Sequence, residues 1–387
     1  MPLFLPTLLV LCVVAIIVQS DVLSITVWSL IAAYVVLRAW TRRSTGALAV
    51  ERRVNGRAFV GEVLDVSLRV RNTGLLPIPW LEMNETLPME LQRGEMPAEV
   101  FSLGPRAERW VHYTVRCRRR GYYDIGPLRV WTGDLLGIER QLTDLPTVEH
   151  LIVYPRIVPL QRLHLPTSSA LVALSAHLPL YHDPSRVVGV REYMPTDSLR
   201  RIHWTATARL GQIMVKEFQP SIARSTTYCL DLNLRSYEAG ERHHAIELAI
   251  TAAASLAHHT IMSDRLAANL VTEAFDPLEG RVCRIATLSG ARSSHLMSVL
   301  EVLARVRAAP TDDFGLLFQK ECAALPAGST IVAITGMRSS SLDRSLLQAA
   351  RLGLAVALIV VGQEVGSAPL ARVPTYRVWN DADLVAV

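Results

Sequence analysis

Two apolar runs at the start of the chain constrain its fold more than any other feature. Residues 3–18 are apolar apart from Thr7, and residues 22–40 contain few polar side chains. The second run has 19 residues, which at about 1.5 Å per residue nearly crosses a hydrocarbon layer of about 30 Å, whereas the first run is marginal. Residues 19–21 leave room only for a tight turn between the runs. The sequence pattern therefore predicts that residues 1–43 form a transmembrane helical hairpin.

Basic residues predict the orientation of this hairpin. Arg38, Arg42 and Arg43 follow the second run, and Arg52 and Arg53 come soon after it. Because Lys and Arg accumulate on the cytoplasmic side of spanning helices, we expect the hairpin in the inner, cytoplasmic membrane. Both termini and residues 44–387 then lie in the cytoplasm. The alternative is a cleaved signal peptide, which normally starts with a positive segment, and no Lys or Arg precedes Arg38.

Cysteines and net charge narrow the class of protein only a little. The five cysteines are far apart and form no CxxC pair, which argues against a disulfide framework and a cysteine zinc site. We expect isolated, buried thiols in a reducing compartment. A formal net charge of +5 is compatible with anionic lipid, nucleic acid or an acidic protein as a partner, and it distinguishes none of them.

Residues 44–160 have the pattern of a β-rich, sandwich-like domain. Apolar side chains alternate with polar ones over residues 63–70, and the sequence at 72–74 predicts a turn after that strand. Further strands are predicted at residues 81–87, 109–116, 121–125, 128–131 and 149–154, with Gly and Pro between them. The arginines at 116 and 118–120 fit a solvated strand end or a lipid-headgroup contact, with a nucleic-acid patch as the alternative.

Residues 225–387 predict a doubly wound α/β domain. Strand-like segments at 226–232, 266–271, 330–334 and 355–361 alternate with helix-like segments at 242–262, 293–308 and 341–352. Such alternation is typical of a parallel sheet with helices on both faces. Ligands of these sheets bind beyond the carboxyl ends of the strands, so residues 231–236 and 335–338 are the first places to look for a site.

Asp231, Asn233 and Thr335 are weak candidates for a divalent cation site at these strand ends, because hard oxygen ligands suit such cations. Arg235 argues against the site, since it places a fixed positive charge where the cation would sit. The sequence has no GxxxxGK[ST] loop, GxGxxG turn or GxSxG elbow, and the histidines at 243, 244, 258 and 259 lack the HExxH spacing of zinc helices. We therefore expect no metal and no cofactor.

Residues 161–224 combine a predicted linker with the densest group of charged and aromatic side chains in the chain, at 189–220. The candidate site residues in it are Arg191, Glu192, Tyr193, Asp197, Arg200, Arg201, His203, Trp204, Arg209, Lys216 and Glu217. Between residues 186 and 217, six basic side chains face three acidic ones, so not all of them can be paired locally. This surplus suits an acidic partner.

Three interpretations of this stretch are open. In the first, arginines meet Glu192, Asp197 and Glu217 in a buried network that joins the β-rich and α/β domains. In the second, the stretch is a docking surface. In the third, Asp197, His203 and Arg209 form a catalytic site, with His203 titrating near neutral pH. We also expect Asp197 to cap a helix that starts at residue 198.

The same stretch resembles the signature of the DUF58 family of bacterial proteins, approximately R-E-Y-x-P-G-D-x-x-R-x-I-H-W-x-x-x-A-R followed by V-K-E. The matching residues are Arg191, Glu192, Tyr193, Pro195, Asp197, Arg200, Ile202, His203, Trp204, Ala208, Arg209, Val215, Lys216 and Glu217. Thr196 stands where the family usually has glycine, and Thr205 or Ala206 lies where a lysine is often found. The paired apolar runs and residues 119–122, 126–127 and 134–137 are also similar to the family, so the resemblance covers nearly the whole chain.

The resemblance implies a membrane-anchored protein with a von Willebrand factor A-like α/β domain that often lacks a complete metal site. Such proteins are commonly associated with MoxR-type AAA+ ATPases, with a role in assembling or maturing other proteins. We therefore expect a membrane-tethered cytoplasmic scaffold or adaptor for such an ATPase and other membrane-associated proteins, and not an enzyme. An enzyme built on Asp197, His203 and Arg209 is the alternative. Nucleic-acid binding, with affinity falling steeply with salt, is the weaker one.

Overall fold

The computed structural model describes residues 4–19, 21–93, 100–134, 140–160, 182–195, 197–220, 225–326, 328–362, 370 and 372–386. The chain divides into two units, Met1–Pro155 and Arg156–Val387. The predicted linker at residues 161–181 lies outside the described residues.

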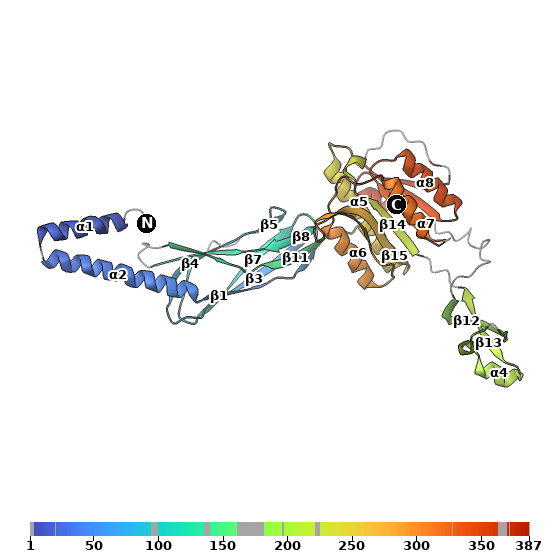
Figure 1. The fold of residues 1–387 in the computed structure, drawn as a ribbon, viewed down its shortest axis with the longest axis horizontal. Helices are drawn as coiled ribbons and strands as arrows, with labels where there is room; N and C mark the ends of the chain where they lie inside the picture. The colour runs from blue at the N-terminus through green and yellow to red at the C-terminus, as the bar shows by residue number, and fades with distance from the viewer. Residues whose placement is uncertain are drawn as a thin grey trace. The chain divides into compact units, whose positions relative to one another are not determined.

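Helices fill both N-terminal apolar runs. α1 (Phe4–Val18) and α2 (Asp21–Gly46) pack against one another, with Gln19 in a left-handed conformation between them (Figure 1). α2 is long and apolar enough to cross a membrane, and only 6% of its most apolar window is buried. With 15 residues, α1 is shorter than a full span of a typical bilayer.

One other helical segment, Arg242–Ser263, is also long and apolar enough to cross a membrane. Its most apolar window, however, is 78% buried, and alanines along it pack on the C-terminal sheet. An apolar helix that is buried in its own domain is a core helix, so this segment belongs to the fold of the second unit.

The end of α2 packs directly on the β-rich domain. Thr41, Ser44 and Thr45 are buried, the Trp40 indole N–H donates to the Pro77 carbonyl oxygen at 2.9 Å, and the hydroxyl of Thr45 lies 2.8 Å from that of Thr132. The helix therefore continues three residues past the predicted boundary at residue 43 and ends inside the domain. No separate linker stands between helix and domain.

The β-rich prediction is confirmed, with more strands than the sequence indicated. One sheet has the order β1-β3-β7-β5 and a second has the order β10-β9-β4-β6, and a three-stranded sheet has the order β2-β11-β8. Their bounds are β1 Leu48–Arg53, β2 Arg57–Phe59, β3 Val63–Asn72, β4 Ile78–Glu85, β5 Leu91–Arg93, β6 Phe101–Leu103, β7 Glu108–Cys117, β8 Gly121–Ile125, β9 Leu128–Gly133, β10 Arg140–Leu145 and β11 Glu149–Tyr154.

Alternation of buried and exposed side chains builds the core of this domain. Val66, Leu68 and Val70 of β3 point inward and meet Leu81 of β4 and Val130 of β9 in one hydrophobic cluster. Because β3 belongs to one four-stranded sheet and β4 and β9 to the other, the two sheets share a single core.

A buried ion pair crosses this core. Arg52 and Glu85 contact one another with no exposed side-chain surface, and the Tyr113 hydroxyl donates to the second Glu85 oxygen at 2.6 Å. The Arg52 guanidinium also donates to the carbonyl oxygens of Ile125 (2.9 Å) and Thr147 (2.8 Å). Burial, together with the Glu85 carboxylate, raises the pKa of Tyr113. The use of Arg52 as evidence for the orientation of the hairpin is therefore wrong, because its guanidinium is buried and paired with Glu85 and does not face the membrane surface.

The second unit contains a six-stranded sheet of order β16-β15-β14-β17-β18-β19. The strands are β14 Ser225–Asp231, β15 Ala267–Asp276, β16 Arg281–Ala286, β17 Thr330–Thr335, β18 Ala355–Val361 and β19 Thr375–Val378. The helices are α5 Arg242–His258, continued by a π-turn to Ser263, α6 Ser293–Arg305, α7 Phe314–Ala324, α8 Ser340–Arg351 and α9 Asp381–Ala386.

Helices cover both faces of this sheet, as the alternating pattern predicted. Alternate residues of the central strands, such as Cys229 and Ile331, cluster with Phe318 of α7 and Leu346 of α8. The residues between them face α5, where the hydroxyl of Tyr228 lies 2.6 Å from that of Thr260. One strand departs from the prediction of a parallel sheet: β16 runs antiparallel to β15 at the edge. A short hairpin at residues 276–281 forces this direction, since parallel neighbours need a long crossover.

The cysteines are free thiols, and three are buried as expected. Cys117, Cys229 and Cys322 lie in the two cores, and burial raises the pKa of each. Cys12 and Cys283 are only partly buried.

The Arg52–Glu85 pair yields a stability prediction. Arg52→Met leaves the buried Glu85 carboxylate without its cation, so we expect the free energy of unfolding of the β-rich domain to fall by about 3–5 kcal/mol. Arg52→Met with Glu85→Leu removes both charges and should recover part of that loss. Urea denaturation measures both variants. The control is Arg129→Met, which removes an exposed pair with Asp144 (3.6 Å) and should cost less than about 1 kcal/mol. Equal effects of Arg52→Met and the control would contradict the prediction.

Candidate functional site

The stretch that the sequence singled out forms a small module. β12 (His182–Glu192) pairs antiparallel with β13 (Met214–Pro220), and the chain between them holds a single 3-10 turn, η1 (Leu199–Arg201), and the short helix α4 (Trp204–Leu210) (Figure 1). Among the side chains of this stretch that the structure describes, those of Ile202, Met214 and Val215 are buried. We call residues 182–220 the signature module.

Arg191 and Asp197 clamp the first loop of the signature module. The guanidinium donates to both carboxylate oxygens, at 2.6 and 2.7 Å, and the Met194 backbone N–H donates to the same carboxylate at 2.9 Å. These hydrogen bonds, that from Arg191 first, lower the pKa of Asp197. The prediction that Asp197 caps a helix starting at residue 198 is wrong, because only the η1 turn follows and its first residue has no side-chain cap.

His203 is the side chain that caps the helix. Its Nδ1 atom accepts the backbone N–H of Ala206 at 3.1 Å at the start of α4. Gly211 ends the helix in the left-handed conformation, and the Thr207 hydroxyl donates to the His203 carbonyl oxygen at 3.1 Å. Accepting a hydrogen bond at Nδ1 requires the neutral ring with its proton on Nε2. His203 therefore has a structural use within the module.

The exposed side chains of the signature module include apolar and basic ones. Trp204 is 71% exposed, and Met194, Leu199, Leu210 and Ile213 are exposed as well. Arg201 and Arg209 are exposed on the same segments, while Lys216 and Tyr193 are partly buried. The side chains of Arg200 and Glu217 lie outside the described residues. Five large apolar side chains are thus exposed within 20 residues of the chain, which makes this segment the candidate for an interaction surface.

The three candidate catalytic residues are not brought together. Among the residues that the structure describes, no hydrogen bond or ion pair joins Asp197, His203 and Arg209. Asp197 is held by Arg191, and His203 by the start of α4. Of the first interpretation, the structure contains the arginine fork on Asp197, formed by Arg191, whereas Glu192 is exposed.

The second candidate site lies where the strand order of the α/β domain reverses, between β14 and β17. Asp231 ends β14 and is buried, and the Thr335 hydroxyl at the end of β17 donates to its carboxylate at 2.8 Å. Asn233 turns away: its side-chain N–H₂ donates to the Thr311 carbonyl oxygen at 3.0 Å. The structure thus joins two of the three weak metal candidates and places the third in a neighbouring loop.

Tyr237 fills the crevice at this point. Its hydroxyl donates to the Asp231 carbonyl oxygen at 2.6 Å, and its ring packs on Gly336, where a Cβ atom would come within 2.3 Å of the ring. Burial raises the pKa of Asp231 above the ordinary value of 3.8. In the described part of the chain, no group of three or more His, Cys, Asp or Glu side chains is placed to hold a metal ion. The crevice is therefore packed rather than open.

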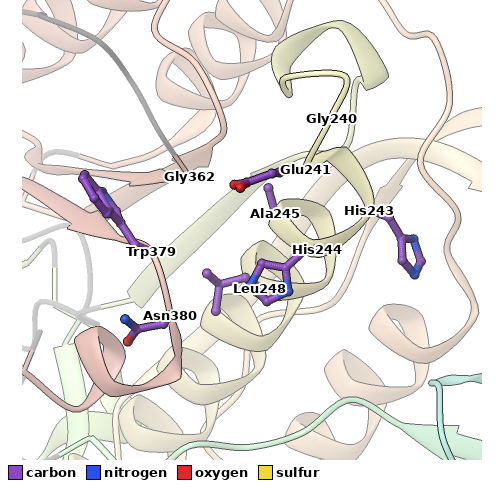
Figure 2. A pocket seen from close by; sticks show the side chains of 9 residues that line it. All are labelled: Gly240, Glu241, His243, His244, Ala245, Leu248, Gly362, Trp379 and Asn380. Carbon is purple, nitrogen blue, oxygen red and sulfur yellow. The ribbon is translucent and has the colours of Figure 1, made fainter.

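An open cavity of about 600 Å³ lies further along the same edge of the sheet. It is lined by the start of α5 with Glu241 and His244, by Gly362 after β18, and by Trp379 and Asn380 after β19. Figure 2 shows the Glu241 side chain directed toward Trp379, whereas His243 points away. The sequence interpretation of these histidines as helix-end residues agrees with their exposure, and it missed the cavity.

Comparison with known proteins supports the resemblance. The family described as "Protein of unknown function DUF58" matches residues 189–330, from the signature module to the first residue of β17. The resemblance to this family is thereby confirmed over that stretch. "Uncharacterized protein YeaD" of Bacillus subtilis (strain 168) is 27% identical over 179 residues, which are 44% of this chain and 44% of that protein. The chain thus matches less than half the length of this relative.

Solved structures are similar only in part. A CARDB domain from Pyrococcus furiosus, described in complex with di-metal ions, is 17% identical, with a TM-score of 0.21 over 27% of this chain and 91% of that one. A fragment of Escherichia coli alpha-2-macroglobulin is 18% identical, with a TM-score of 0.25 over 28% of this chain and 16% of that one. At these TM-scores the likenesses carry no argument.

Asp231 gives a pH prediction. Because its folded pKa is raised, the folded domain keeps a proton at pH values where the unfolded chain has lost it, so stability falls as pH rises through that range. Asp231→Asn removes this ionisation, and its amide can donate to Thr335. We expect the variant to exceed the unsubstituted protein in free energy of unfolding at about pH 8, with the difference shrinking toward about pH 4.

The matched control is Asp276→Asn at the end of β15. Asp276 is also buried, but it pairs with Arg305 at 3.0 Å, so its loss should destabilise the domain. Chemical denaturation across pH measures both variants. A melting temperature that rises with Mg²⁺ in the unsubstituted protein and not in Asp231→Asn would identify Asp231 as a cation ligand and overturn our interpretation of a packed crevice.

Proposed function

We propose that this protein is a membrane-tethered scaffold or adaptor that binds a partner protein through the exposed face of its signature module. The observation that carries the proposal is the 71% exposure of Trp204 in a short segment, residues 199–210, where Leu199, Leu210 and Arg209 are exposed too. Trp, Met and Arg are enriched at protein interfaces, and Trp and Arg dominate their binding energy. Asp197 and His203, which an enzyme would need free, support the shape of this face instead.

The proposed tether consists of α1 and α2 as a transmembrane hairpin. α2 has the length and composition of a span, and α1 packs beside it. Arg42 and Arg43 are exposed at the end of the apolar part of α2, which favours the cytoplasm on that side. α1 then brings the N-terminus back to the same side, and the β-rich domain, the signature module and the α/β domain all lie in the cytoplasm.

The proposed partner is a MoxR-type AAA+ ATPase, as the family resemblance implies. The α/β domain fits a von Willebrand factor A-like fold in its strand order, with β14 central, β15 and the antiparallel β16 on one side, and β17 to β19 on the other. Tyr237 occupies the strand-end crevice, so recognition by this domain does not depend on a bound cation in our proposal.

Substitution of Trp204 tests the docking face. α4 has no buried residue, so Trp204→Ala and Leu199→Ala should leave the module folded. We expect Trp204→Ala to raise the Kd for the MoxR-type ATPase of the same bacterium by about tenfold or more, because a Trp that acts as a hot spot contributes about 2 kcal/mol or more, and Leu199→Ala to raise it by a smaller factor. Full-length protein in detergent or nanodiscs is titrated against the purified ATPase. The control is Trp379→Ala, another exposed tryptophan (54%) outside the module. Equal affinity of all three variants would refute the docking face.

Protease accessibility tests the tether and its orientation. In inverted inner-membrane vesicles, protease should digest the chain after residue 46, whereas in intact spheroplasts it should leave the chain whole. Carbonate washing should not release the protein, because a spanning helix is inserted in an effectively irreversible way. Digestion from the outside of spheroplasts would refute the cytoplasmic orientation, and release by carbonate would refute the tether.

A further inference from the structure

The loop between β3 and β4, residues 73–77, is attached to the end of α2. The Thr73 backbone N–H and hydroxyl both donate to the Ala47 carbonyl oxygen, at 2.8 and 2.7 Å. At the other end of the loop, the Pro77 carbonyl oxygen accepts the Trp40 indole N–H at 2.9 Å. The loop therefore lies beside the last two turns of the helix.

Buried hydrogen bonds hold this loop in one shape. Asn72 is fully buried, and its side-chain N–H₂ donates to the carbonyl oxygens of Leu76 (2.8 Å) and Gly104 (3.0 Å), while its side-chain oxygen accepts the Gly74 N–H at 2.9 Å. Gly74 is needed for the close approach to the helix end, since a Cβ atom there would lie 2.8 Å from the Ala47 Cβ. In this rigid loop Leu75 is 72% exposed, so its side chain faces either water or a partner.

The level of Trp40 along α2 identifies that partner. From Asp21 to Trp40 the helix rises about 28 Å at 1.5 Å per residue, close to the hydrocarbon thickness of about 30 Å. Trp40 thus lies where a spanning α2 leaves the hydrocarbon, a level at which tryptophan is enriched. The loop is bonded to Trp40 at Pro77 and to Ala47 at Thr73, and these two helix positions are about 10 Å apart along the axis, so Leu75 lies between the hydrocarbon edge and the headgroup side of it.

Exposed basic side chains lie at the end of α2 and next to the loop. Arg42 and Arg43 are exposed within one turn after Trp40. Arg106 is exposed as well, and its backbone N–H donates to the Gly74 carbonyl oxygen at 3.2 Å. An apolar tip flanked by arginines matches the boundary between acyl chains and anionic headgroups, where each basic residue near the surface contributes about 1 kcal/mol.

We infer that residues 73–77 form a lipid-contact loop, with Leu75 inserted among the headgroups of an anionic leaflet and Arg42, Arg43 and Arg106 against their phosphates. This inference rests on the proposed tether. It adds that the β-rich domain has two attachments to the membrane, the spanning helix α2 and the loop at residues 73–77 beside it.

A fluorescent label at residue 75 tests the inference in the full-length protein. Leu75→Cys is labelled with an environment-sensitive dye after Cys12→Ser and Cys283→Ser remove the thiols that are not buried, and the protein is reconstituted into phosphatidylcholine–phosphatidylglycerol vesicles. The control is Val63→Cys. Val63 is 50% exposed and begins β3, the strand whose other end leads into the loop. We expect spin-labelled lipid to quench the dye at residue 75 at least about twofold more than the dye at residue 63. A side chain at the interface lies about 5–10 Å into the bilayer and meets the spin labels, whereas residue 63 is at the far end of β3.

The outcomes separate the inference from the proposed tether. Equal quenching at the two positions, in protein that resists carbonate washing, would refute the lipid-contact loop and leave the tether intact. Release by carbonate would refute both. A blue-shifted label at residue 75 without lipid quenching would show that a protein, such as a second copy of this chain, covers the loop instead. Quenching that is unchanged when phosphatidylglycerol is omitted would overturn the role given to the arginines.

Discussion

The packing of the α2 end against the β-rich domain is the contact on which the arrangement of the first unit depends. A helix end leaves four carbonyl groups without intrahelical partners, and here Thr73 donates twice to the carbonyl oxygen of Ala47, the residue that follows the helix. Thr45 and Thr132 add a buried hydroxyl contact. Through these interactions the last residues of α2 pack as part of the β-rich domain. The direction of the helix and the orientation of the domain are therefore set together.

The signature module uses its polar residues differently from what their types suggest. An acid, a histidine and arginines close together in sequence invite a catalytic interpretation. In the structure Asp197 neutralises Arg191 and accepts the Met194 N–H, and His203 begins α4. Both side chains stabilise loops. What they hold in place is the segment that exposes Trp204, and this exposed segment is the basis of the proposed adaptor role.

Secondary structure was predicted best from the sequence where the buried positions of an element follow a regular spacing. β18 matches its predicted bounds because a central parallel strand is apolar at every position, and α5 was predicted because alanines and other apolar residues recur along it at helical spacing. β12 and β13 were missed because their residues are charged and alternate irregularly across a bulge, so no period of two stands out. The His203 cap was missed because histidine is an uncommon capping residue, although Gly211 does signal the helix end. Tyr237 gave no sequence signal, since only the approach of Gly336 shows what its ring fills.

The signature module enters and leaves the fold at neighbouring positions, because His182 at the start of β12 pairs with Pro220 at the end of β13. A segment whose two ends meet behaves as a cassette: its length and content can change without altering the distance that the flanking chain must bridge. Exchange of the module between relatives therefore replaces the proposed docking face as one piece and leaves the flanking β-rich and α/β domains unchanged. If the module is the docking face that we propose, such an exchange changes the partner without changing the scaffold.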